Sequence, residues 1–152
     1  MATISEIAHN PLNIRATSDK WWGQIGVYKG FVSFESDVYG FRAAFKIIFG
    51  YIGLGFDTPR KIISKWAPSS ENDVEAYLSF VCNKALYKLH ANSPLNLSDL
   101  RRLVFNMAMY ERGKKPVFTD VVDGFNYAID CLNKVQTMGY IIVYDREIDS
   151  YF

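Results

Sequence analysis

Apolar residues recur at helical spacing over most of this 152-residue chain, and this periodicity restricts the fold more than any other feature. Each helical run begins at or just after a serine or threonine, the residue types that cap helix N-termini. The runs cover Ser36 to the Gly53-Leu54-Gly55 stop, Thr58-Pro59 to Trp66, a stretch opened by Ser70-Glu71-Asn72-Asp73, Ser98 to about Arg112, and Thr119 to about Thr137. We therefore predict a mainly α fold with about five helices.

Two segments follow the period of two that is typical of β-strands. Residues 21–34 alternate partly around Tyr28-Lys29-Gly30, which predicts a short hairpin with glycine in its turn. Residues 140–152 alternate enough to form a strand, which would need a partner to be stable. The fold class is therefore α+β in detail, with one small hairpin and a strand-like C-terminal tail.

The length indicates one domain, which we place at residues 1–139, followed by the tail. The polar, proline-containing connection HANSPLNLS divides this domain into two lobes, residues 1–89 and 97–139.

Charge and composition exclude several classes of function. Seventeen basic against sixteen acidic residues give a net charge of +1, which argues against a nucleic-acid partner. The N-terminus has no signal-peptide pattern, and the longest apolar stretch, between Lys46 and Asp57, is too short to cross a membrane. Cys82 and Cys131 lie in helical patterns far from any histidine-rich cluster, so we expect buried thiols rather than a disulfide framework or a zinc site. Aromatic residues make up 16% of the chain, more than a core of this size needs, so some should line a groove.

Glu111 is the strongest catalytic candidate. The apolar stripe of its helix consists of Leu100, Leu103, Val104, Met107 and Ala108, and Glu111 is the next member of that stripe. Burial and the negative end of the helix dipole both raise the pKa of such a carboxyl group, as a general acid requires. In the alternative interpretation, Glu111 extends to solvent or pairs with Arg112, Lys114 or Lys115.

Two further acids are candidates for a second catalytic group. Glu35 stands beside the predicted hairpin, and Glu71 stands in a predicted first helical turn, where acids commonly serve as caps. His9 and His90 have no partner at a recognisable spacing, and we assign them no role.

Several motifs resemble those of a family of phage and prophage proteins with an Asn-Asn-Pro-Gly-Asn-Ile-Arg signature. They are the segments at residues 9–15, 22–24, 30–34, 39–43, 66–73 and 109–116, and their order matches over most of residues 9–131. Members of this family are described as virion structural proteins or as virion-associated, lysozyme-like enzymes that degrade peptidoglycan. The chain also has a looser similarity to lytic transglycosylases, in which the catalytic glutamate comes before an asparagine-rich segment. Here that segment comes first, at residues 10–15, and Glu111 comes second, so a circular permutation would reconcile the order.

The resemblance implies a lysozyme-like domain that cleaves the glycan strands of peptidoglycan as a transglycosylase or muramidase, with Glu111 as the acid and Glu35, Asn13 or Glu71 as the second group. It implies a virion location and no cofactor. Including aromatic residues that could face sugar, the substrate-binding candidates are Asn10, Asn13, Arg15, Trp21, Trp22, Gln24, Tyr39 and Tyr77.

The chain departs from the family pattern at Leu12, where the family has glycine, and at Arg112, where it has asparagine. The first change predicts a reshaped loop, because leucine does not readily adopt a positive φ. The second leaves Glu111 intact. The alternative function is a non-catalytic virion or wall-binding protein, whose tail, with Tyr140-Ile141-Ile142-Val143-Tyr144, contacts other virion proteins.

Overall fold

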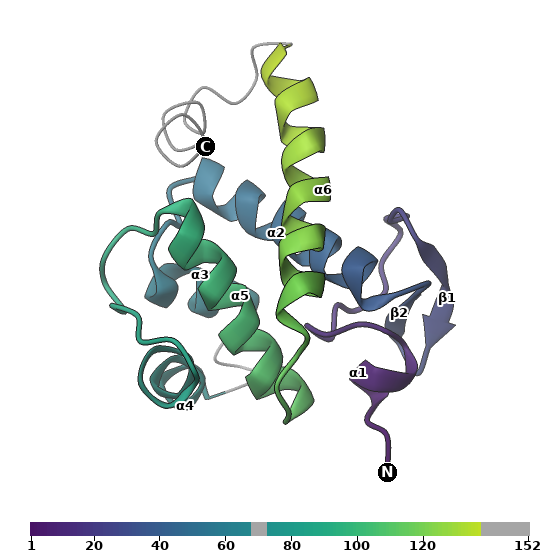
Figure 1. Ribbon diagram of the computed structural model, residues 1–152, viewed down its shortest axis with the longest axis horizontal. Helices are drawn as coiled ribbons and strands as arrows, with labels where there is room; N and C mark the ends of the chain where they lie inside the picture. Colours follow the sequence, from purple (N-terminus) through teal and green to yellow (C-terminus); the bar gives the residue numbers. More distant parts are fainter. Residues whose placement is uncertain (68–72, 138–152) are drawn as a thin grey trace.

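The structure, a computed structural model, describes residues 1–67 and 73–137, with six α-helices and one two-stranded antiparallel sheet in these ranges (Figure 1). The elements are α1 (Ile4–Ile7), β1 (Gln24–Tyr28), β2 (Phe31–Phe34), α2 (Asp37–Gly53), α3 (Pro59–Trp66), α4 (Val74–Ser79), a single π-helical turn (Phe80–Lys84), α5 (Leu97–Arg112) and α6 (Phe118–Thr137). The predicted fold class, mainly helical with one small hairpin, is confirmed. The predicted tail at residues 140–152 lies outside the described residues.

Local sequence signals account for most of the element boundaries. Thr58 caps α3 and Pro59 occupies its first turn, as predicted. The hairpin turns at Lys29-Gly30, where both residues have positive φ, the geometry of a tight two-residue turn. The cap of α5 was predicted wrongly: Asn96, two residues before Ser98, accepts the hydrogen bond from the Asp99 amide.

Other differences arise where the sequence signal is weak. Helix α6 begins at Phe118, so Thr119 lies inside it. Helix α1 is only four residues long and was not predicted, although Thr3 and Glu6 form a capping box around its first turn. The π-helical turn after α4 was also missed, because no local pattern distinguishes it from an α-helix.

Helices α2 and α6 cross at the centre of the molecule, while α3, α4 and α5 lie on one side of them and the hairpin on the other (Figure 1). Gly124 makes the crossing possible, because a Cβ atom there would lie 2.5 Å from Cβ of Phe41. Phe125 then packs edge-on against Phe45, with ring centroids 5.2 Å apart. The core is therefore a helical layer to which the hairpin is attached at one end.

The N-terminal segment after α1 connects the hairpin to the helices. Its backbone pairs with β2, since the Val32 amide donates to the Ile14 carbonyl and the Phe34 amide donates to the Ala8 carbonyl. Its other side presses on α2 at Gly40, where a Cβ atom would lie 2.6 Å from Cδ of Pro11. This segment is therefore held on two sides, which fixes the side chains that it carries.

Candidate active site

Glu111 lies at the C-terminal end of α5, as the apolar stripe predicts. The five preceding members of the stripe, Leu100, Leu103, Val104, Met107 and Ala108, are all buried. Gly113 ends the helix with φ 81°, the left-handed conformation that glycine adopts readily. The helix therefore ends immediately after its last inward-facing position, and that position is a carboxylate.

Two side chains from other parts of the chain donate hydrogen bonds to the Glu111 carboxylate. The Tyr77 hydroxyl donates to Oε2 at 2.7 Å, and Nδ2 of Asn13 donates to Oε1 at 3.1 Å. The Asn13 amide also lies 3.3 Å from the Glu111 carbonyl oxygen. Both partners are neutral, so the carboxylate is oriented without a full compensating charge.

The basic residues that follow Glu111 are engaged elsewhere. Arg112 forms a two-pronged ion pair with Asp37, at 2.8 and 3.0 Å, and Lys114 pairs with Glu6 at 2.8 Å. Glu111 makes no ion pair with any described residue. The alternative in which Glu111 pairs with Arg112, Lys114 or Lys115 is therefore wrong.

The surroundings of Glu111 raise its pKa above the ordinary value. Burial is the largest cause, since it disfavours the charged form, and the hydrogen bonds from Tyr77 and Asn13 oppose it. The Tyr77 hydroxyl, fully buried beside this carboxylate, has its pKa raised as well, first by burial and then by the charge of Glu111. Tyr77 therefore stays a hydrogen-bond donor at neutral pH.

The position of Asn13 depends on a neighbouring asparagine. Asn10 is fully buried, and its amide donates to the carbonyls of Ile14 and Val32 while its oxygen accepts from the Ile14 amide. These three bonds close the loop that carries Asn13, whose φ of 54° is left-handed. Asparagine tolerates this conformation better than most residues. Leu12 is buried and is not among the residues with positive φ, so the loop places its left-handed residue at position 13.

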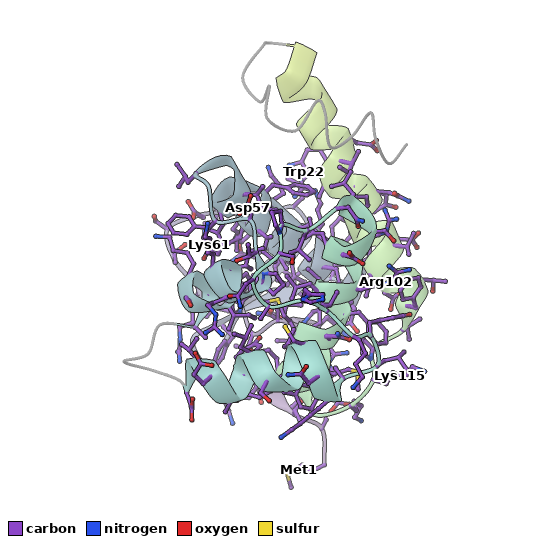
Figure 2. All side chains as sticks on the ribbon, turned by 90° about the vertical axis from the view of Figure 1, so that its left-hand side faces the viewer. Met1, Trp22, Asp57, Lys61, Arg102 and Lys115 are labelled. Carbon is purple, nitrogen blue, oxygen red and sulfur yellow. The ribbon has the colours of Figure 1, made fainter. Side chains whose placement is uncertain are left out.

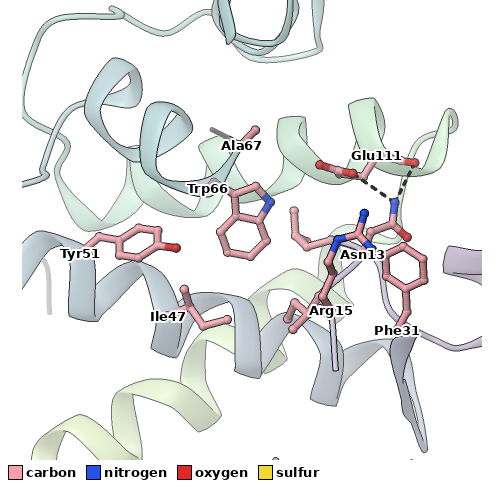
Figure 3. A pocket seen from close by; sticks show the side chains of 10 residues that line it. Asn13, Arg15, Phe31, Ile47, Tyr51, Trp66, Ala67 and Glu111 are labelled. Atoms are coloured by element: carbon pink, nitrogen blue, oxygen red, sulfur yellow. Dashed lines mark hydrogen bonds between the residues drawn. The ribbon is translucent and has the colours of Figure 1, made fainter. Parts of the chain in front are cut away.

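Glu111 opens into a pocket of about 360 Å³ formed where the N-terminal segment, the hairpin, α2, α3 and α5 meet (Figure 3). Figure 3 shows Glu111 and Asn13 together at one end of the pocket and Tyr51 toward the other. The lining residues are Leu12, Asn13, Ile14, Arg15, Phe31, Ile47, Tyr51, Trp66, Ala67 and Glu111. The guanidinium of Arg15 lies over the Phe31 ring, 5.0 Å from its centroid. The pocket thus combines one acid, one cation and an aromatic wall.

Of the predicted substrate-binding residues, Asn13 and Arg15 line this pocket, and Tyr77 reaches it only through its bond to Glu111. Asn10 closes the loop as described. The Gln24 side chain accepts from the Trp21 amide and donates to the Gly26 carbonyl, which organises the start of the hairpin.

The remaining candidates lie elsewhere. Tyr39 packs against Tyr127, and Trp21 and Trp22 line a different pocket. Glu35 is exposed just after β2 and does not line the Glu111 pocket. Glu71 lies outside the described residues.

The sequence interpretation missed three aromatic residues of the pocket: Phe31, Tyr51 and Trp66. Phe31 and Trp66 stand within segments that carry the family resemblance, which was an available signal. Tyr51 had no such signal, since it follows the helical pattern of α2 and is partly buried among core residues. Burial raises its pKa.

The described residues lack the features of two other classes of protein. No cluster of three or more His, Cys, Asp or Glu residues suited to a metal ion occurs in this part of the chain. Within the same residues, every helix is too short or too polar to cross a bilayer.

The fold and pocket together define a small, mainly helical protein with a partly buried acid at a helix end. No family model matches the chain. The chain is, however, 32% identical over 126 residues to protein P5 of Pseudoalteromonas phage PM2, and the match covers 78% of each protein. The chain therefore belongs to the family of this phage protein, which confirms the prediction of a bacteriophage protein.

Proposed function

We propose that this protein is a lysozyme-like, peptidoglycan-cleaving glycosidase that a phage virion carries to open the host cell wall. The observation that carries the proposal is Glu111, a carboxyl group with a raised pKa that opens into an aromatic-walled pocket and has no cationic partner among the described residues. Its relation to a phage protein and the resemblance in the motifs supply the biological setting.

The environment of Glu111 suits both halves of a proton transfer. Burial raises the pKa of Glu111 and so favours the protonated form, which is the form that donates a proton to the glycosidic oxygen. After the transfer, the hydrogen bonds from Tyr77 and Asn13 stabilise the carboxylate that remains. Glu111 would therefore act as the general acid, with Tyr77 and Asn13 positioning it.

Among the described residues, Glu111 is the one carboxylate that lines the pocket. Glycosidases with two carboxylates use the second one as a nucleophile or to activate water. Without it, the positive charge on the sugar must be relieved by the substrate itself, through its N-acetyl or 6-hydroxyl group. The described pocket therefore favours substrate-assisted cleavage, and attack by the 6-hydroxyl would give anhydro ends. Glu71 remains the candidate second acid.

The other wall of the pocket offers contacts suited to glycan strands. The rings of Phe31, Tyr51 and Trp66 present flat apolar faces against which sugar rings pack. Arg15 is exposed at the pocket and carries a charge that would attract the carboxylates of the peptide stems. These contacts would hold the strand while Glu111 acts.

The test is the release of soluble muropeptides from purified peptidoglycan, followed by mass spectrometry of the products. We expect the wild-type protein to release muropeptides, and anhydro ends would support attack by the 6-hydroxyl group. Glu111→Gln removes the transferable proton with little change of shape, so release should fall by about 100-fold or more. Glu75→Gln is the matched control, because Glu75 is exposed and pairs with Arg60 outside the pocket.

Full activity of Glu111→Gln would contradict the assignment of Glu111 as the general acid, and Glu35→Gln and Glu71→Gln would then be tested.

One observation favours a second candidate function. Asn13 bonds both the side chain and the backbone carbonyl of Glu111, an arrangement that also fastens the N-terminal segment to α5. A virion structural or wall-binding protein would keep these two hydrogen bonds, which join the N-terminal segment to α5, without catalysing cleavage. No release from any wall type at any pH, together with retained wall binding, would favour it.

A further inference from the structure

A second pocket, of about 400 Å³, lies between the loop before β1 and the first half of α2. It is lined by Asp19, Lys20, Trp21, Trp22, Arg42 and Lys46, and it shares no residue with the Glu111 pocket. Trp22 marks its position in Figure 2. The lining therefore contains three basic residues, one acidic residue and two indole rings.

Arg42 is the unusual member of this pocket. The residue is only 2% exposed, yet it makes no ion pair with any described residue, and its buried Nε has no hydrogen-bond partner there. The guanidinium of Arg42 instead lies over the Trp22 ring, whose centroid is 4.5 Å from the guanidinium carbon. A buried charge without an opposite charge is costly, and a cation–π contact offsets only part of that cost.

Two further cations line the same pocket. Lys46 follows Arg42 by four residues on α2, so the two cations lie on the same face of the helix. Lys20 adds a third positive charge from the loop, against the single negative charge of Asp19. An anion bound here would provide the opposite charge that Arg42 lacks.

Trp22 indicates what the anion is attached to. Its side chain is 65% exposed at the mouth of the pocket, although one face of the indole is occupied by Arg42. An exposed aromatic ring beside hydrogen-bond donors is the arrangement that binds sugar rings. We propose that this pocket is a second carbohydrate site, separate from the Glu111 pocket, which binds a sugar that carries a phosphate or carboxylate group.

A nucleic-acid strand is a less suitable ligand. Binding of single strands requires a basic groove that follows several phosphates, with successive aromatic rings for successive bases. Here one exposed indole accompanies a confined pocket, and Asp19 would repel a continuous polyanion.

The test uses ¹⁵N-labelled full-length protein and follows the indole N–H signals during titration with glucose 6-phosphate. We expect the Trp22 signal to shift and the Trp66 signal, from the other pocket, to stay in place. Glucose and inorganic phosphate are the two matched ligands. Each should bind at least tenfold more weakly than glucose 6-phosphate, because each lacks one of the two recognised parts.

Arg42→Met should weaken binding of glucose 6-phosphate by at least tenfold, and Lys20→Met, in an exposed loop, by a few-fold. Lys115→Met removes the same charge from an exposed position away from the pocket and should have no effect (Figure 2). Glu111→Gln should also bind normally, so the result is independent of the proposed catalysis. If Arg42→Met does not fold, Lys20→Met decides alone.

Three outcomes would overturn the proposal. The first is the absence of any Trp22 shift, which would make the Arg42–Trp22 contact purely structural. The second is equal binding of inorganic phosphate and glucose 6-phosphate, which would remove the role of the sugar. The third is tighter binding of a short oligo(dT) strand than of glucose 6-phosphate, which would indicate a nucleic-acid site.

Discussion

Glu111 and Arg112 are neighbours at the end of α5, yet their charged side chains have different kinds of partner on the two sides of the helix. On the Arg112 side, the guanidinium is bound by both oxygens of Asp37 and by the side chain and carbonyl of Ser5. On the Glu111 side, the donors to the carboxylate among the described residues are both neutral, and the carboxylate faces a pocket. Adjacent helix positions point about 100° apart, so each side chain meets a different set of partners.

This difference separates a group that holds the fold from a group that is available for chemistry. Arg112 is paired with the opposite charge of Asp37 and hydrogen-bonded to Ser5, so it links α1 and α2 to α5. The Glu111 side keeps a carboxyl group whose pKa is raised by burial. Proteins accept such unbalanced groups mainly where function requires them. The same reasoning supports the ligand site at Arg42.

The largest effect on stability is expected from Arg112→Met. The substitution removes the two hydrogen bonds that Arg112 donates to Asp37, whose other ionisable neighbour is Nδ1 of His9 at 3.6 Å. Because Asp37 is only 19% exposed, we expect the free energy of unfolding to fall by about 3 kcal/mol. Chemical denaturation measures this change. Arg102→Met is the matched control, since it breaks a pair with Asp99 that is about 40% exposed and should cost about 1 kcal/mol or less. Equal losses in the two variants would remove the distinction drawn between the two sides.

A smaller effect, on activity, is expected from Asn13→Gly. Glycine retains the left-handed backbone of position 13 but removes the hydrogen bond to Glu111, so wall cleavage should fall by about tenfold. The pKa of Glu111 should rise further, because that bond lowers it, and the alkaline limb of the pH profile should move up.

Lys29→Gly is the control for Asn13→Gly, since Lys29 has a similar φ of 50° in the hairpin turn, away from the pocket. An unchanged pH profile in Asn13→Gly would show that the Asn13 side chain matters through its bond to the Glu111 backbone carbonyl and not through its bond to the carboxylate.

The third effect concerns the pH dependence of stability in Glu111→Gln. The folded-state pKa of Glu111 lies above its ordinary value of 4.5, so folding disfavours the ionised form. This penalty is absent below the unfolded pKa, grows as the pH rises through the folded value, and is constant above it. The variant should therefore gain stability relative to wild type as the pH rises from 4 to 7. Thermal unfolding over this range measures the difference, and a difference of the opposite sign would mean that the hydrogen bonds outweigh burial.

The smallest effect is expected from Lys114→Met. The hydrogen bond from Lys114 is the largest of the causes that lower the pKa of Glu6 from its ordinary value of 4.5 to about 2. NMR titration should show this pKa rising toward 4.5 in the variant. In wild type, the stabilisation is present above the unfolded pKa and is lost as the pH falls toward 2. Because the pair is at the surface, stability at pH 7 should hardly change, and a large loss would contradict this interpretation.

The sequence by itself determined the local elements and the direction of one catalytic candidate. Helical periodicity and turn residues predicted α2, α3, the hairpin and the inward position of Glu111, because these features depend on residues a few positions apart. Where the local signal was ambiguous, as at Ser98 and Asn96, the prediction of the cap was wrong by two residues.

Only the tertiary structure decided which residues accompany Glu111. Tyr77 and Asn13 lie 34 and 98 positions away in the chain, and no local pattern relates them to the end of α5. The tertiary structure also placed Trp22 against Arg42, in a pocket apart from the one that contains Glu111. Periodicity shows which face of a helix is buried but not what packs against it. That choice depends on how α2, α5, α6 and the N-terminal segment fill space together, which involves contacts across nearly the whole length of the chain.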